Sequence, residues 1–402
     1  MNTTINHDMM RSENILAVLQ CIQKRGPIYR KEIKDITGLS WGSISTIVNE
    51  LLEKELIIEE QSDVKAKGRN PGGLDINVRK SHIIGIDINR AGITLVLMDL
   101  KCNVNTSYFE KIIRTDSASV LGQVYSMLDG MFEKSRKEKD KIFGIGVAMQ
   151  GNVDSKEGVS KYCPYFSDWE NVPLRKMLEE RYQCKVIVEH SPDCMALYET
   201  WFGVAKGVKN FLFVRIGAAI GISIIADGKV VYGHNGNAGE FGHMIVEPKG
   251  ELCSCGGHGC LETVVSQTSI LKQAVNAVKA GRKSRLSDFV PQSQMDEIDM
   301  DCIYRACCMG DELCLEIMDK VAFYLGIAIS NVINLLNPEL IALGGSMMQY
   351  GNLFIDKMRK VVEERAWKGS EKTILVSSSK TNTAAEGASL NIMKEILSGT
   401  IK

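Results

Sequence analysis

One short stretch near residue 250 concentrates side chains that can bind a metal. It contains Cys253, Cys255 and Cys260, and His243 lies shortly before them. Three thiolates and one imidazole make a closed four-coordinate set, which is what a structural Zn²⁺ site requires. Glycines between the cysteines let the loop turn with positive φ. The alternative is three reduced thiols in a glycine-rich turn, but free cysteines rarely group in this way. We therefore predict a structural zinc site.

Length and composition limit the class of protein. A chain of 402 residues with 45% hydrophobic and 24% charged residues predicts two or three globular domains. The net charge of −1 excludes a protein that binds nucleic acid through its overall charge. Twelve cysteines without a signal peptide suit metal binding and reduced thiols better than disulfides. The apolar segments are too short or too interrupted to span a bilayer, so we expect a cytoplasmic protein without a membrane partner.

The first eighty residues predict a helix-turn-helix followed by two strands. Apolar periodicity indicates helices over 14–24 and 30–37, and a third helix that Ser40 caps. The glycine-containing turn before Ser40 has the spacing of a helix-turn-helix. Alternating segments over 56–60 and 74–78 are typical of the two sides of a wing. The alternative is a three-helix protein-interaction module with a solvated, charged surface.

In a helix-turn-helix, the outward face of the third helix enters the major groove of DNA. None of its outward residues is an arginine that could pair with guanine, so the operator sequence stays open. Residues 1–80 carry 12 Lys and Arg against 11 Asp and Glu, a net charge of +1, so local cations must contact the phosphates. The DNA-binding candidates are Arg30, Ser40, Trp41, Ser43, Ser45, Thr46, Asn49, Lys67 and Arg69.

The metal-binding stretch resembles the signature of the ROK family (repressors, open reading frames, sugar kinases). In that family a Gly-Glu-x-Gly-His segment precedes a Cys-x-Cys-Gly-x-x-Gly-Cys-x-Glu zinc loop, and both are intact here. The resemblance extends over nearly the whole chain. It implies an α/β protein with an N-terminal winged helix-turn-helix, which ROK repressors carry and ROK kinases lack, followed by a two-lobed actin-like ATPase/sugar-kinase fold.

The resemblance also implies where the domains lie. We expect a winged helix-turn-helix DNA-binding domain over 1–80, a first lobe over 81–200 and a second lobe with the zinc loop over 201–383. A C-terminal helix within 384–402 is expected to return to the first lobe. Strand–turn–strand units at 83–100 and 211–231 suit the internal duplication of such a fold. The run around Arg69 resembles the family's Gly-Arg-Pro linker, which can place an arginine in the minor groove.

Several residues match positions that bind sugar hydroxyls in the family. Glu240, His243 and Glu262 are the first group, and a carboxylate suits this role because it accepts hydrogen bonds from two hydroxyls. His243 would serve both zinc and sugar through its two ring nitrogens. The alternative for Glu262 is a capping or solvated carboxylate. His190 would either bond a sugar hydroxyl or be satisfied by loop backbone, and Tyr165 would either stack on a sugar or fill the pocket.

The residues that family kinases need for catalysis are altered. Ser191 stands where the kinases have their general base, and a serine without a neighbouring base cannot accept a proton near pH 7. Asp193 lies nearby, but Pro192 fixes the turn between them. Both glycine-rich phosphate turns are changed, at 89–91 and at 217–219, where side chains now stand in place of glycine. We therefore expect no catalytic residue and no enzyme activity.

These features predict a transcriptional regulator, specifically a repressor of carbohydrate uptake or catabolism genes. Its kinase-like body would sense a sugar or sugar phosphate. Its partners would be a double-stranded DNA operator and a second copy of the chain, as a homodimer or higher homo-oligomer. One alternative is an ATP-dependent ROK sugar kinase with an extra N-terminal domain, which retained Asp87, Glu240 and Glu262 favour. The other is a regulator whose effector is a protein partner.

Overall fold

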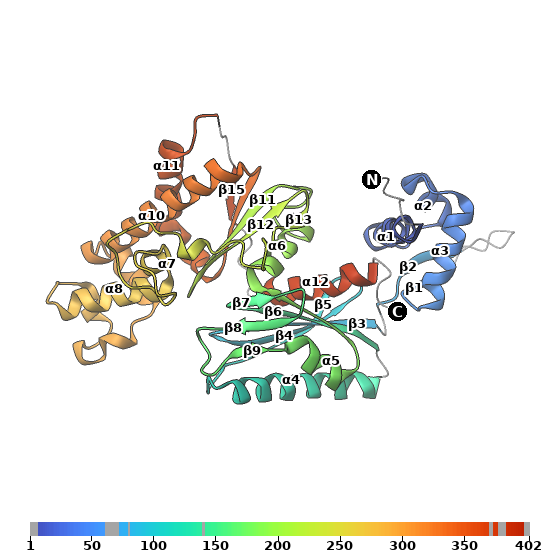
Figure 1. The fold of residues 1–402 in the computed structure, drawn as a ribbon, viewed down its shortest axis with the longest axis horizontal. Helices are drawn as coiled ribbons and strands as arrows, with labels where there is room; N and C mark the ends of the chain where they lie inside the picture. Colours follow the sequence, from blue (N-terminus) through green and yellow to red (C-terminus); the bar gives the residue numbers. More distant parts are fainter. Residues whose placement is uncertain are drawn as a thin grey trace. The chain divides into compact units, whose positions relative to one another are not determined.

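The computed structural model divides the chain into two compact units. Unit 1 comprises Met1–Cys194 and Asn382–Lys402, and unit 2 comprises Met195–Thr381. The structure describes residues 7–60, 72–78, 81–138, 141–369, 373–376 and 383–397. Figure 1 shows the helices and strands of both units. Within these ranges, no helix combines the length and the apolar character that a membrane crossing needs.

Unit 1 begins with three helices and a small antiparallel sheet, the element order of a winged helix-turn-helix. The elements are α1 (His7–Arg25), α2 (Arg30–Thr37), α3 (Trp41–Glu53), β1 (Ile57–Glu60) and β2 (Gly73–Ile76). Gly38 ends α2 with φ 70°, and its N–H bonds the Lys34 carbonyl. Ser40 caps α3 by accepting a hydrogen bond from the Ser43 N–H. The apolar stripe of α3 is buried, and it includes Ile44, Ile47, Val48 and Leu51.

A five-stranded sheet forms the body of unit 1, in the order β10-β6-β3-β4-β5. Its strands are β3 (Ser81–Asn89), β4 (Gly92–Asp99), β5 (Val104–Glu110), β6 (Lys141–Met149) and β10 (Lys185–His190). β3, β4 and β5 are antiparallel, whereas β3, β6 and β10 are parallel. Helices α4 (Ser117–Glu138) and α5 (Leu174–Tyr182) pack their apolar side chains on this sheet. A three-stranded sheet is added by β7 (Asn152–Asp154), β8 (Val159–Tyr162) and β9 (Glu170–Val172).

The last helix, α12 (Thr383–Leu397), packs against β3 and β6, as Figure 1 shows. Two strand glycines permit this contact. A Cβ on Gly85 would lie 2.0 Å from the Ala385 carbonyl oxygen, and one on Gly146 would lie 1.9 Å from that of Ala388. The backbone of α12 therefore approaches the sheet more closely than any side chain would allow.

Unit 2 repeats the same sheet topology, in the order β13-β12-β11-β14-β15. Its strands are β11 (Phe211–Ile216), β12 (Ile220–Ala226), β13 (Lys229–Val230), β14 (Leu340–Gly344) and β15 (Thr373–Val376). As in unit 1, the first three strands in sequence are antiparallel neighbours and the later two are parallel. The predicted internal duplication is confirmed.

The helices of unit 2 bury an extensive apolar core against this sheet. They are α7 (Glu262–Val265), α8 (Gln267–Lys279), α9 (Met300–Cys308), α10 (Glu312–Leu336) and α11 (Ile355–Arg365), with short 3₁₀ turns at Phe241–His243, Arg285–Asp288, Gln292–Glu297 and Ser346–Leu353. Helix α6 (Ser191–Trp201) begins in unit 1 and ends in unit 2. Helices α7 and α8 are separated by Ser266, whose backbone is extended (φ −68°, ψ 149°) and whose side chain caps α8 by accepting a hydrogen bond from the Ser269 N–H.

Candidate functional site

The structure brings together the four predicted metal ligands. Their ligand atoms all lie within 4.8 Å of one another. The Cys253 Sγ lies 3.6 Å from His243 Nδ1, and the Sγ atoms of Cys255 and Cys260 are 3.6 Å apart. Tetrahedral Zn²⁺ with bonds of about 2.3 Å to sulfur would set its sulfur ligands roughly 3.8 Å apart. The donor set and its spacing therefore fit a four-coordinate metal ion.

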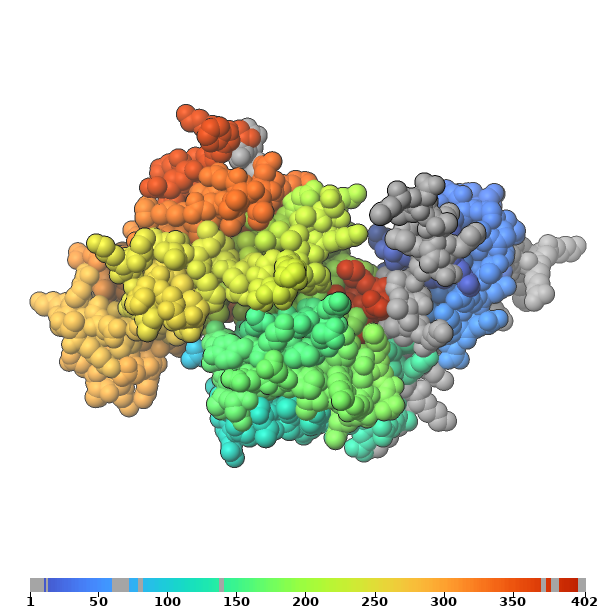
Figure 2. Space-filling view, viewed as in Figure 1, coloured from blue at the N-terminus to red at the C-terminus, as the bar shows by residue number. Residues whose placement is uncertain are grey.

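The loop that carries the thiols is tightly built. The Cys253 N–H bonds the Gly257 carbonyl, and a Cβ on Gly259 would lie 1.7 Å from the Glu247 carbonyl oxygen. Burial, together with the neighbouring thiols of Cys255 and Cys253, raises the pKa of the Cys260 thiol to about 12. Three thiolates at this spacing repel one another, so a bound cation is the natural way to keep them deprotonated. Figure 2 shows this segment, in yellow, at the surface of unit 2.

Two carboxylates of unit 2 flank the metal-ligand group. The second ring nitrogen of His243, Nε2, lies 3.8 Å from the Glu240 carboxylate, and the Glu240 side chain is about half exposed. Glu262 begins α7 and accepts a hydrogen bond from the Ile220 N–H at 3.2 Å. One Glu262 oxygen is therefore engaged in holding the start of β12. The structure thus places Glu240 and His243 side by side, with His243 turned toward both the thiols and a carboxylate.

In unit 1, the predicted effector residue His190 is the last residue of β10. Its Nδ1 lies 4.0 Å from the Asp193 carboxylate. The next residue, Ser191, is buried and donates a hydrogen bond to Asp87 Oδ1 at 3.1 Å. The other carboxylate oxygen of Asp87 accepts from the Asn89 amide at 2.7 Å. The carboxylate of Asp87 is thus held from two sides by side chains of unit 1.

The turn after β3 is closed by its own side chains. The Asn89 Oδ1 accepts a hydrogen bond from the Ala91 N–H at 2.8 Å, and the Arg90 N–H donates to the buried Gln150 Oε1 at 3.3 Å. The guanidinium of Arg90 lies over the ring of Tyr165, 5.7 Å from its centroid. Tyr165, the other effector candidate of unit 1, is half-buried and contributes to the apolar core of this unit.

Six of the predicted DNA-binding residues lie on α2 and α3, and a seventh, Ser40, is the N-cap of α3. Arg30 begins α2 and is half-buried. On α3 the side chain of Trp41 is about half exposed, and Thr46 and Asn49 are exposed. Ser43 and Ser45 are partly exposed, and the hydroxyls of Ser40 and Ser43 bond each other at 2.8 Å. Lys67 and Arg69 lie outside the residues that the structure describes.

Sequence reasoning missed a polar contact between the helix-turn-helix and the sheet of unit 1. Lys101, in the turn between β4 and β5, pairs with the buried Asp75 of β2 at 2.6 Å. The Gln23 amide of α1 lies 3.1 Å from the Cys102 Sγ in the same turn. Asp99 fixes this turn by accepting from the N–H groups of Lys101 and Asn103. These residues are far apart in sequence and carry no motif that could have signalled the contact.

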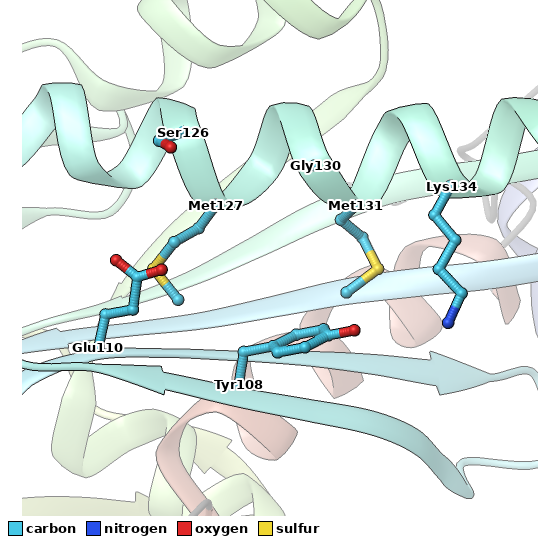
Figure 3. A pocket seen from close by; sticks show the side chains of 7 residues that line it. All are labelled: Tyr108, Glu110, Ser126, Met127, Gly130, Met131 and Lys134. Atoms are coloured by element: carbon cyan, nitrogen blue, oxygen red, sulfur yellow. The ribbon is translucent and has the colours of Figure 1, made fainter.

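A groove of about 290 Å³ opens between β5 and α4, as Figure 3 shows. Gly130 in the middle of α4 leaves it open, since a Cβ there would meet no atom within 4 Å. None of the predicted effector residues lines this groove. Its lining residues are Tyr108, Glu110, Ser126, Met127, Gly130, Met131 and Lys134.

Comparison with known proteins gives a family and several relatives. The family described as the ROK family matches residues 83–395. The "DNA-binding transcriptional dual regulator NagC" of Escherichia coli K12 is 30% identical over 98% of this chain and 96% of its own length. The "xylose repressor" of Caldicellulosiruptor bescii is 29% identical over 90% of both chains.

Two solved structures differ in how much of the chain they cover. A ROK family transcriptional regulator, described as a homologue of the E. coli MLC protein, is 28% identical, has a TM-score of 0.85 and covers 98% of both chains. A ROK family glucokinase from Streptomyces griseus, solved with glucose and AMPPNP, is 24% identical and has a TM-score of 0.68. It covers 77% of this chain but 98% of its own. The likeness to the kinase shows a shared fold.

Proposed function

The chain belongs to the ROK family, and we propose that it is a DNA-binding transcriptional regulator of carbohydrate genes that acts as a repressor. One observation carries this proposal. The regulators match the chain over 90% or more of its length, whereas the glucokinase matches 77% of it. The family match begins at residue 83, after the three helices and the two-stranded sheet. The part added to the kinase-like body has the element order of a DNA-binding domain.

The proposed domains follow from this division. Residues 1–80 form a winged helix-turn-helix that binds the operator, residues 81–200 with the C-terminal helix form the first lobe, and residues 201–383 form the second. The contact of Lys101 with Asp75 supports a link between the first two, because it joins β2 to the turn of the β4–β5 hairpin. A homodimer would present two such domains to paired half-sites.

We propose that the body binds a sugar or sugar phosphate through Glu240, His243, Glu262, His190 and Tyr165. Effector binding would change the affinity for DNA because the two binding equilibria are coupled. The carboxylate of Glu240 beside the His243 ring offers acceptors for vicinal hydroxyls. The name of the xylose repressor supports a sugar as the effector class.

The metal held by Cys253, Cys255, Cys260 and His243 is proposed to be structural zinc. Zinc would tie the thiol loop to the segment that carries Glu240 and so fix the carboxylate that faces the His243 ring. A closed set of four protein ligands leaves no open coordination position, which is the condition for a structural and not a catalytic ion.

The altered phosphate turn of unit 1 supports a regulator that does not transfer phosphoryl groups. Two N–H groups of this turn, those of Arg90 and Ala91, already bond Gln150 and Asn89 side chains. A turn that binds phosphate needs such N–H groups unbonded and pointing at the ligand. At the position of the kinase base, the Ser191 hydroxyl donates a hydrogen bond to Asp87, and the serine side chain is itself no base.

The test is binding of the full chain to DNA from its own upstream region, compared with a scrambled duplex of equal length at several salt concentrations. We expect specific binding that weakens linearly in log affinity against log salt. In parallel, the chain is assayed for ATP-dependent phosphorylation of a sugar panel, with no product expected. Phosphorylation of any sugar, without preference for the upstream DNA, would overturn the proposal.

A further inference from the structure

The exposed face of α3 shows which base pairs it can recognise. Its outermost residues follow a spacing of four, three and four positions, so they form one stripe along the helix. All four residues of the stripe are exposed, and none is basic. They are Gly42, Thr46, Asn49 and Glu53.

The two central residues of the stripe, Thr46 and Asn49, differ in whether their polar groups are already hydrogen-bonded. The Thr46 hydroxyl donates to the Gly42 carbonyl at 3.0 Å, so this group is engaged within the helix. The threonine methyl is the part of the side chain left for contact with a partner. The Asn49 amide, in contrast, has no hydrogen-bond partner among the residues that the structure describes. It keeps both a donor and an acceptor for a ligand.

Gly42 gives an independent indication of close approach. Among the described residues, a Cβ at this position would meet only the Ser40 Oγ, at 4.0 Å, so packing within this part of the chain does not require glycine there. A glycine in a helix costs roughly 0.5–1 kcal/mol relative to alanine. A glycine that nothing in the fold requires, on the exposed face of this helix, suits a backbone that approaches another molecule closely.

The neighbouring charges do not supply a guanine contact. Glu50 follows Asn49 in the sequence, and it is paired with Arg11 at 2.8 Å and with Lys54 at 3.0 Å. Arg11 and Lys54 are therefore both held at Glu50, which is not one of the stripe residues. The exposed cations of the preceding helix, Lys31 and Lys34, are therefore candidates for phosphate contacts.

We propose that α3 reads A·T base pairs in the major groove, with Asn49 pairing to adenine and the Thr46 methyl contacting a thymine methyl. An asparagine amide matches the N6 and N7 groups of adenine, and an apolar contact with the thymine C5-methyl is the other mark of an A·T pair. Guanine recognition through its O6 and N7 commonly uses Arg or Lys, which this stripe lacks. The inference rests on the proposed function, since it concerns the operator that the regulator binds.

The experiment uses the full chain and the shortest upstream duplex that it binds specifically. Each base pair is replaced in turn, each thymine is replaced by uracil to remove its methyl group, and each adenine by 7-deazaadenine to remove N7. Affinities are measured by fluorescence anisotropy at one fixed salt concentration. The variants are Asn49→Ala, Thr46→Ser, Thr46→Val and Gly42→Ala, all at exposed positions where folding is expected to be preserved and is checked by thermal melting.

The wild-type chain should lose about 5- to 140-fold in affinity when the A·T pair read by Asn49 is replaced. Asn49→Ala should lose this discrimination and become insensitive to 7-deazaadenine at that position. Thr46→Ser should abolish the sensitivity to uracil at one thymine, whereas Thr46→Val, which keeps a methyl group, should retain it. Gly42→Ala should raise the melting temperature and yet weaken operator binding.

A phosphate-contact variant serves as the matched control. Lys31→Gln should weaken binding to all duplexes equally and reduce the salt slope by about one. Specific binding whose base preferences are unchanged in Asn49→Ala and Thr46→Ser, or whose costliest replacements are all G·C pairs, overturns the inference while leaving the proposed function intact. Absence of specific binding to any duplex overturns the proposed function itself.

Discussion

Replacing Lys101 by methionine tests whether the ion pair between the helix-turn-helix and the sheet of unit 1 contributes to the stability of the fold. Methionine keeps the apolar stem and removes the ammonium, which lies 2.6 Å from Asp75. The side chain of Asp75 is 10% exposed and that of Lys101 is 29% exposed. The substitution therefore leaves a nearly buried carboxylate without its cation.

The size of the effect follows from this burial. Exposed ion pairs are worth about 0.2–1 kcal/mol, whereas breaking a fully buried pair costs about 3–5 kcal/mol. A pair with one nearly buried partner and one partly exposed partner lies between these, at about 2 kcal/mol. For a unit of this size, 2 kcal/mol corresponds to a fall in Tm of roughly 4–8 °C.

The assay is thermal unfolding of the full chain, with a matched control and a double-variant cycle. Lys279 also pairs at 2.6 Å, with Asp296, but both side chains are well exposed. Lys279→Met should therefore change the Tm much less than Lys101→Met does. Asp75→Asn should be destabilising alone, and combining it with Lys101→Met should cost less than the sum of the two. Equal effects of the two lysine variants, or strict additivity in the cycle, would show that the pair of Lys101 and Asp75 does not stabilise the fold.

Three further predictions concern the metal, the packing of α12 and the effector. Cys260→Ser should abolish stoichiometric zinc in the purified protein, measured by elemental analysis, whereas Cys308→Ser, at an exposed thiol outside the ligand set, should not. Because burial and the neighbouring thiols raise the pKa of Cys260 to about 12 and zinc binds the thiolate, zinc uptake should release protons and should weaken as the pH falls. Gly146→Ala should lower the free energy of unfolding by about 1–3 kcal/mol, because its Cβ would meet the α12 backbone. Gly122→Ala, in open space on α4, should instead raise it by about 0.5–1 kcal/mol, and denaturant titration distinguishes the two. Glu262→Gln should raise the effector concentration needed for half-maximal response about tenfold or more, since it removes a charged acceptor.

Local patterns in the sequence predicted much of the fold. The apolar stripe of Ile44, Ile47, Val48 and Leu51 predicted α3, and Ser40 predicted its start, because burial and capping act within one helix. The spacing of Cys253, Cys255 and Cys260 predicted a metal-ligand group because these thiols lie close together in the sequence. No local pattern marks the break between α7 and α8, because apolar residues continue through it and only the extended backbone of Ser266 separates the two helices.

Contacts between distant segments could not be predicted in this way. The pair of Lys101 and Asp75 depends on how the β4–β5 turn meets β2, which no local pattern encodes. The same holds for Asn89, whose side chain bonds Asp87 and the Ala91 N–H. The sequence showed that the glycines of a phosphate turn are replaced there. The structure adds that the replacing side chain bonds a backbone N–H group that a phosphate would need.

A sugar titration of the DNA complex tests whether the chain is a carbohydrate-sensing regulator. The full chain is bound to its upstream duplex, and sugars and sugar phosphates are added one at a time while fluorescence anisotropy is recorded. We predict that one of these compounds changes the affinity for DNA by about 5- to 150-fold, whereas the others have no effect. Specific DNA binding that no sugar or sugar phosphate alters would contradict a carbohydrate-sensing regulator.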